Sequence, residues 1–264
     1  IRVEGDNVHA VAEQLRLPVT GPFQLTGQLS GYLNRPFFSG NLRLQDWALK
    51  QHPLGPLQSR VSYLNKTILF QKGSVRSGEG TGVASASGIV HFGKQPAYYV
   101  TSDMASVNPQ EVIRLFKPGI PITTTATGKL LIEGHGKQVK VTGPLTVGEG
   151  VFYGESFKKG RLHLIVTEKK VRVQKVRLEK DQGILQGDGE ISYQGEYVLD
   201  TKTTLLPIQT VALIHKRIPD LSGDFHMTVR GKGTLKSPHL KCVANVTRLQ
   251  YREAKMESGT LYLD

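Results

Sequence analysis

Apolar and polar residues alternate in short runs along most of this chain. The stretches GRLHLIV at 160–166 and GDFHMTV at 223–229 are two examples. A period of two places the apolar positions on one face of a β-strand and the polar positions on the other. Gly, Pro, Asn and Asp, which favour turns, separate the runs. The pattern therefore predicts an all-β protein whose strands each have one apolar face.

Turns and irregularities can be placed from the same pattern. Asn65-Lys66 separates two apolar runs and predicts a hairpin, and Glu168-Lys169-Lys170 predicts a further turn. The apolar phase shifts by one position after Val173, which predicts a β-bulge near Lys175. Glycine-rich sequence also predicts loops joining short strands between Gly73 and Gly88, and turns at Asp188-Gly189 and Gly231-Lys232-Gly233.

Three short helices are predicted between the strands. Asn108 is a suitable N-cap, because its side-chain oxygen can accept from the free N–H groups of the first turn. Pro109 suits the first helical position, and Pro118-Gly119 ends that helix. Similar signals predict helices from Asn7 to Leu15 and between Pro207 and Pro219.

These signals recur at a nearly constant spacing, which is typical of internal repeats. Three pairs of residues share one offset: Asn7 and Asn108 (108 − 7 = 101), Gly27 and Gly128, and Gly82 and Gly183. The predicted repeat units are residues 1–104, residues 105–204 and a partial unit at 205–264. We expect the chain to be a segment of a longer protein.

A sheet with one apolar face must cover that face, and three short helices are too few to do so. The sheet could close on itself as a sandwich or barrel, or it could curl into a trough whose lining a ligand fills. Repetition favours the trough, because stacked units form a continuous groove. We therefore expect an elongated, curled antiparallel sheet that forms a U-shaped hydrophobic groove.

The lining of such a groove suits the acyl chains of lipids. Its predicted members are apolar residues at alternating strand positions. They are Leu25, Leu29, Leu42, Leu44, Leu130, Ile132, Leu162, Leu164, Val166, Leu185, Ile191, Phe225, Met227 and Leu240.

The charge balance suits either an anionic partner or a solvated polar face. The 264 residues include 34 Lys and Arg against 22 Asp and Glu, a net charge of +12. These cations are dispersed along the strands, so they suit anionic lipid head groups better than the grooves of nucleic acid. Cys242 is the only cysteine, which excludes an intrachain disulfide, and it lies in an apolar run where a small core residue is expected.

No catalytic or metal-binding pattern stands out, and we expect neither an enzyme nor a cofactor. The eight histidines are scattered, and no His-x-x-x-His or Cys/His spacing indicates a metal site. The segment from Gly78 to Gly82 lacks the Gly-Lys-Ser/Thr ending of a phosphate loop. We place His163 and His226 on the polar side of their strands.

Three stretches resemble the TamB family of the AsmA-like superfamily: LTGQLSGYLNRPFFSGNL, NPQEVIRLFKPG and GKGTLKSPHLKCVANVTRLQY. The resemblance implies a β-groove segment in the periplasm of a bacterium with two membranes. It also implies an inner-membrane anchor outside this segment and an outer-membrane β-barrel partner similar to TamA. The function it implies is movement of phospholipid between the membranes.

Two alternatives to lipid binding remain open at this stage. The apolar trough could act as a chaperone or scaffold for outer-membrane β-barrel proteins, with its strand edges offered to nascent strands. The sheet could also be a self-packed structural domain without a ligand.

Overall fold

A computed structural model describes residues 1–6, 19–32, 34–49, 52–53, 55–76, 82–110, 121–136, 138–234 and 236–263. The fold is all-β, as predicted, and 17 strands among these residues belong to one antiparallel sheet that does not close. The chain divides into two compact units. The N-terminal unit comprises residues 1–119 and 126–143, and the C-terminal unit comprises 120–125 and 144–264.

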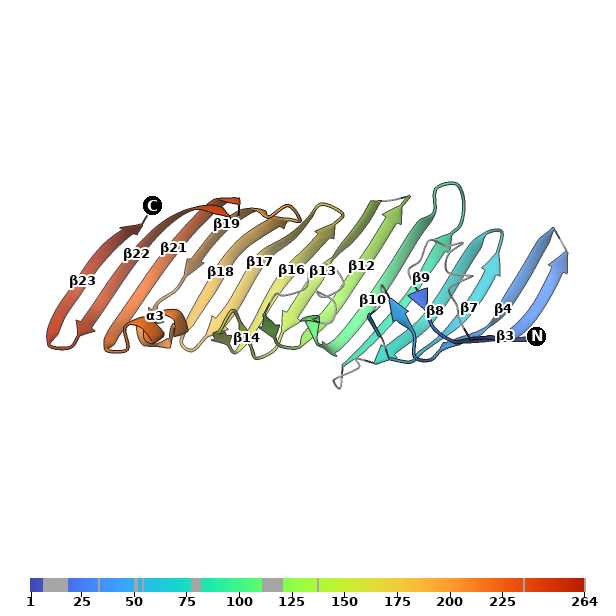
Figure 1. Ribbon diagram of the computed structural model, residues 1–264, viewed down its shortest axis with the longest axis horizontal. Coiled ribbons are helices and arrows are strands. Elements are labelled where there is room, and N and C mark those ends of the chain that lie inside the picture. Colours follow the sequence, from blue (N-terminus) through green and yellow to red (C-terminus); the bar gives the residue numbers. More distant parts are fainter. Residues whose placement is uncertain are drawn as a thin grey trace. The chain divides into compact units, whose positions relative to one another are not determined.

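The strands of the N-terminal unit pair with their neighbours along the chain (Figure 1). The pairing runs from β1 through β3, β4, β7, β8, β9 and β10 to β12. Their bounds are β1 Arg2–Gly5, β3 Phe23–Tyr32, β4 Arg35–Leu44, β7 Leu57–Leu64, β8 Thr67–Arg76, β9 Val83–His91, β10 Ala97–Val107 and β12 Ala126–His135, with β13 Gln138–Val147 next. The short strands β2 Val19–Thr20, β5 Ala48–Leu49 and β6 His52–Pro53 form a small sheet.

The C-terminal unit follows the same up-and-down plan. Antiparallel pairing runs from β16 through β17, β18, β19, β21 and β22 to β23. Their bounds are β16 Lys159–Thr167, β17 Lys170–Lys180, β18 Gly183–Ser192, β19 Glu196–Thr203, β21 Leu221–Thr234, β22 Ser237–Tyr251 and β23 Ala254–Leu263. β20 Leu206–Pro207 also pairs with β21, and β11 Ile122–Thr123, β14 Gly150–Phe152 and β15 Glu155–Phe157 form a small sheet.

The predicted helix after Pro207 is confirmed. A 3-10 turn, η1 Ile208–Thr210, leads into α3 Ala212–Arg217, which lies at the ends of neighbouring strands (Figure 1). The helix predicted at residues 7–15 and most of the one predicted from Asn108 fall outside the described residues. At the start of the latter, the Asn108 side chain accepts a hydrogen bond of 3.0 Å from the Gln110 N–H, as expected of an N-cap.

The hairpin and the bulge placed by sequence are confirmed. Asn65 and Lys66 both have positive φ and join β7 to β8. Lys175 has a φ of 52°, and the register of β17 shifts there against both β16 and β18. Lys72 and Arg248 have similar φ values at comparable register shifts in β8 and β22. Each of these bulges places two successive residues on the polar side. The apolar residues after the bulge therefore lie on the same face as those before it.

Several glycine signals were misinterpreted as turns or loops. Residues 73–76 and 83–88 belong to the long strands β8 and β9, Asp188-Gly189 lies within β18, and Gly231–Gly233 lies within β21. In these strands glycine allows a large side chain or a neighbouring backbone to come close, which is its other common role in sheets. The Leu240 side chain covers Gly231, for example, because a Cβ there would lie 2.5 Å from Leu240 Cδ2.

The clearest case of such covering is in the N-terminal unit. Gly27 and Gly40 lie opposite each other on β3 and β4. The Phe38 ring extends over both, since a Cβ on either glycine would lie within 2.8 Å of Phe38 Cζ. Tyr98 covers Gly134, its cross-strand partner, in the same way. The rings therefore lie along the sheet, an arrangement that compensates for the missing side chains of strand glycines.

A small core lies where the helical segment packs against the strands of the C-terminal unit. Leu206, Ile208, Phe225 and Val246 are each at most 7% exposed and pack together, with Ile214 of α3 against them. Strands β20, β21 and β22 meet at this point, and α3 covers the apolar side chains there.

Glu155 of β15 fixes the start of α3. Its carboxylate accepts hydrogen bonds of 3.1 Å from the Ala212 and Leu213 N–H groups, and Lys180 Nζ lies 3.2 Å from it. Burial opposes ionisation of Glu155, but these hydrogen bonds and the Lys180 charge outweigh it, so the pKa lies below its ordinary value of 4.5. A carboxylate from another strand therefore replaces the missing N-cap side chain of this helix.

Replacing Glu155 by glutamine is expected to lower the free energy of unfolding by about 1–2 kcal/mol near neutral pH, because the charged acceptor is lost. A carboxylate whose pKa is lower in the folded than in the unfolded protein stabilises the fold at pH values above its unfolded-state pKa. This stabilisation is lost as the pH falls through the folded-state pKa. The difference between wild type and E155Q should therefore shrink as the solution is made more acidic than about pH 4.5. Urea titrations over a pH series measure it, with the exposed Glu253→Gln as control. A pH-independent difference would contradict the capping role.

Candidate functional site: the apolar face of the sheet

Strand pairing places the predicted lining residues of the N-terminal unit on one face. Leu25 lies opposite Leu42, and Leu29 lies opposite Phe38. Further along the sheet, Ile132 lies opposite Val100. Leu44 and Leu130 belong to the same face, because they occupy positions of the same parity on β4 and β12. We call the surface formed by these positions the apolar face of the N-terminal unit.

The C-terminal unit has its own apolar face. Val173 of β17 lies opposite Leu164, and Leu178 lies opposite Leu185. On β21, Met227 lies opposite Ala244 of β22. The remaining predicted residues share this face, namely Leu162, Val166, Ile191, Phe225 and Leu240.

The side chains of these faces are only partly buried. Leu44, Leu130 and Phe225 are below 10% exposed, but Leu29 is 59% and Leu240 is 44% exposed. The other nine predicted residues have intermediate burial. Among the described residues, no large side chain is less than 2% exposed. Neighbouring strands shield these side chains laterally, whereas a second layer is described only locally, as at α3.

The opposite face carries the charges. Arg172 and Lys170 bind Glu190, with 2.8 Å between Lys170 Nζ and a carboxylate oxygen. Their hydrogen bonds, that of Lys170 first, hold the pKa of Glu190 below its ordinary value. Arg230 lies opposite Asp200 and Lys129 opposite Asp103, each within ion-pair distance. His163 and His226 face this side, as predicted. A cation opposite a carboxylate is thus a recurring pairing of the polar face.

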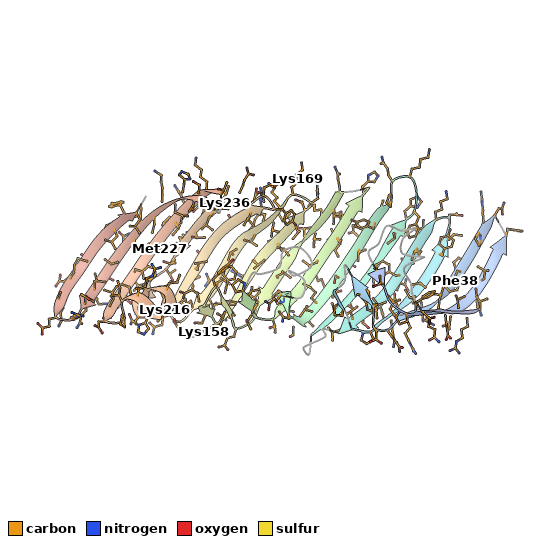
Figure 2. All side chains as sticks on the ribbon, viewed as in Figure 1. Phe38, Lys158, Lys169, Lys216, Met227 and Lys236 are labelled. Atoms are coloured by element: carbon orange, nitrogen blue, oxygen red, sulfur yellow. The ribbon has the colours of Figure 1, made fainter. Side chains whose placement is uncertain are left out.

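Lysines gather at the strand ends of the C-terminal unit. Figure 2 shows Lys169 and Lys236 at the turns on one end of the strands and Lys158 and Lys216 at the other end, with Met227 on the strand between them. All four lysines are exposed. An apolar surface with positive charge at its rims matches a lipid, whose acyl chains are apolar and whose phosphate is anionic.

The described part of the chain offers little for covalent or metal chemistry. It holds no cluster of three or more His, Cys, Asp or Glu residues that could hold a metal ion. Cys242 lies on the apolar face opposite Val229, and burial raises the pKa of its thiol, which disfavours the reactive thiolate. None of the helices among these residues is long and apolar enough to cross a membrane.

The sequence prediction missed several members of the apolar face. Val171, Val173, Val176 and Leu178 of β17 and Val246 of β22 line it alongside the predicted residues. The β17 group was left out because the lining was traced with a strict period of two, which breaks at the Lys175 bulge. The signal that could have revealed them is the phase shift itself, applied to both sides of the bulge.

Comparisons with known proteins leave the family open. No protein-family model, no curated protein and no solved structure matches this chain.

Proposed function

We propose that this protein carries or shields the acyl chains of lipids along the apolar face of its sheet. The observation that carries the proposal is that apolar side chains occupy one face of an open sheet and are left largely half-buried. At roughly 25 cal/mol per Å² of apolar area, an uncovered surface of this kind favours association with another apolar body. Acyl chains provide such a cover at strand after strand.

The self-packed alternative receives less support. A sandwich or barrel requires the sheet to fold back or close, and this sheet does not close. A closed core would also contain fully buried large side chains, of which the described residues have none. The cations at the strand ends favour lipid as the cover, because they suit its anionic phosphate.

The resemblance to the TamB family extends the proposal to a setting. In that setting the protein lies in the periplasm, is held to the inner membrane through a segment other than residues 1–264, and works with an outer-membrane β-barrel partner. The lipid would then be phospholipid that passes between the two membranes.

Lipid extraction and native mass spectrometry of the 264-residue chain test this function. We expect co-purified phospholipid and a mass increase that disappears when the protein is unfolded and extracted. A lipid-free protein that also fails to take up phospholipid or a hydrophobic dye from vesicles would refute the proposal. Preferential capture of unfolded β-barrel polypeptide over lipid would instead support a chaperone.

A further inference from the structure

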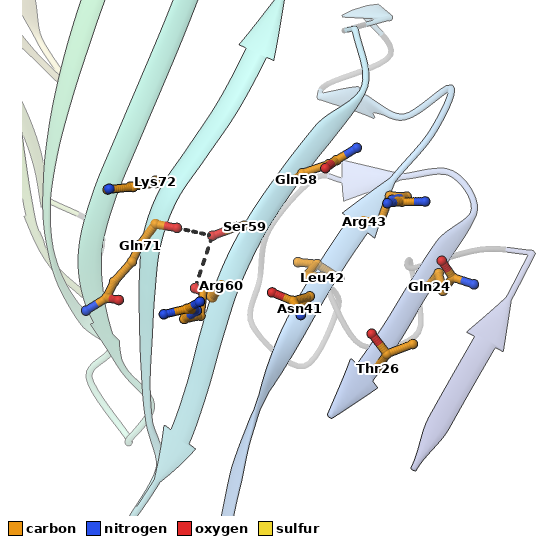
Figure 3. A pocket seen from close by; sticks show the side chains of 10 residues that line it. All are labelled: Gln24, Thr26, Asn41, Leu42, Arg43, Gln58, Ser59, Arg60, Gln71 and Lys72. Atoms are coloured by element: carbon orange, nitrogen blue, oxygen red, sulfur yellow. Dashed lines mark hydrogen bonds between the residues drawn. The ribbon is translucent and has the colours of Figure 1, made fainter. Parts of the chain in front are cut away.

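A second candidate site lies on the polar face of the N-terminal unit. Strands β3, β4, β7 and β8 form a cavity of about 540 Å³ there, a size typical of sites for small molecules (Figure 3). Three cations line it, Arg43, Arg60 and Lys72, and its lining contains no Asp or Glu. In the part of the chain that the structure describes, no carboxylate forms an ion pair with any of the three.

The arginines of this cavity lack the carboxylate partner that several other cations of the polar face have. Arg43 lies between Gln24 and Gln58 on the adjacent strands. Arg60 lies between Asn41 and Gln71. By contrast, Arg172, Arg230, Lys129 and Lys159 each lie directly opposite a carboxylate. Amides can orient a ligand through hydrogen bonds but leave the arginine charge uncompensated.

A bulge adds the third cation to the group. Phe70 and Gly73 both belong to the apolar face, and the extra residue between them lets Gln71 and Lys72 face the polar side together. The bulge is fixed from both sides. Ser59 Oγ, which is buried, donates to the Gln71 carbonyl oxygen at 3.2 Å, and the Lys72 N–H donates to Ser87 Oγ at 3.0 Å. Without the bulge, alternation would direct Lys72 toward the apolar face.

Glu4, an acidic group near the cavity, is paired with another cation. Glu4 of β1 lies opposite Gln24 of β3, and the Glu4 carboxylate accepts hydrogen bonds of 2.5 Å from Gln24 and Arg2. The charge of Glu4 is therefore neutralised by Arg2, and Glu4 does not neutralise Arg43. Arg43 also borders a neighbouring cavity that contains Glu4 and Asp6. We therefore place the anion site on the side of Arg43 that faces Arg60 and Lys72.

We propose that this cavity binds a phosphate ester that carries hydroxyl groups. Arg43 and Arg60 are diagonal neighbours on adjacent strands, a relation that places the Cα atoms about 7–8 Å apart. Their long side chains can therefore bring both guanidinium groups to one phosphate. Arginine is the side chain best suited to bidentate phosphate binding, and the flanking amides match hydroxyl groups. The ester is either a free sugar phosphate or the head group of a lipid. The proposal does not rest on lipid binding by the apolar face, since the two sites lie on opposite faces.

The test uses the whole chain and three soluble probes: inorganic phosphate, glucose 1-phosphate and uncharged glucose. We expect titration calorimetry to show binding of glucose 1-phosphate and none of glucose. The double variant Arg43→Gln/Arg60→Gln should lower the affinity at least about ten-fold, because two charged hydrogen-bond donors are lost. The charge-matched control, Arg161→Gln/Lys202→Gln in the C-terminal unit, should keep wild-type affinity. Flotation with vesicles of phosphatidylglycerol or phosphatidylcholine provides the membrane-borne arm.

The outcomes separate the possibilities. Binding of glucose 1-phosphate that depends on Arg43 and Arg60 identifies a soluble ligand. If binding that depends on Arg43 and Arg60 is observed only with phosphatidylglycerol vesicles, the ligand is a lipid head group. Equal losses in the test and control variants would show attraction by net charge and overturn the proposal, as would wild-type protein that binds none of the phosphate-bearing probes. Thermal unfolding checks that both variants are folded.

Discussion

Replacing Gly40 by alanine is expected to lower the free energy of unfolding by about 3 kcal/mol, because the added methyl group has no room. A Cβ at this position would lie 2.1 Å from the Thr26 carbonyl oxygen and 2.7 Å from Phe38 Cζ. The ring could rotate away, but the carbonyl belongs to the paired strand β3 and moves only with its backbone. Separation of β3 from β4 would also disturb the neighbouring contacts of Leu25 and Leu42.

Urea denaturation measures this effect through the midpoint and the slope. Gly189→Ala is the matched control, because Gly189 lies in the interior of β18 and the nearest atom to its Cβ position is Val173 Cγ2 at 3.5 Å. We expect the control to change stability by less than about 1 kcal/mol. If G40A unfolded at the same urea concentration as wild type, the close approach of β3 and β4 would be wrong.

The fold could be predicted from sequence largely because its pairing is local. Each long strand pairs mainly with its neighbours along the chain, so alternation and turn signals such as Asn65-Lys66 determine which residues share a face. Even the bulge at Lys175 leaves a visible phase shift. Residues 231–233 were misassigned, because glycine in a strand and glycine in a turn look alike until the covering side chain, here Leu240, is known.

The candidate sites differ in how much sequence could reveal. The apolar face was predictable, since each of its strands carries the signal independently. The cation cavity was not, because Arg43 and Arg60 come together only through the register of β4 and β7. Within the sequence both are ordinary polar positions of alternating strands. What distinguishes them is that each arginine has an amide opposite it on both adjacent strands, which is a property of strand pairs and not of any single strand.

Replacing Leu240 by glutamate is expected to lower lipid binding about ten-fold or more if the apolar face holds acyl chains. A leucine side chain contributes about 1.5–3 kcal/mol when it is buried against apolar atoms, and a carboxylate there would also have to lose water. Leu240 is 44% exposed in the free protein, so the change should cost little folding stability. Uptake of phospholipid from vesicles, followed by native mass spectrometry, measures the effect.

Val243 offers a control on the same strand. It is 38% exposed and lies opposite Thr228 on the polar face, whereas Leu240 lies opposite Gly231 on the apolar face. Val243→Glu therefore introduces the same charge at similar exposure on the other side of β22. The N-terminal unit provides a second such pair, with Leu29 at 59% exposure on the apolar face and Leu64 at 45% on the polar face. Equal loss of lipid in both members of either pair would show that net charge, and not the apolar face, governs binding. Loss confined to L240E and L29E is the result that one-sided acyl-chain binding requires.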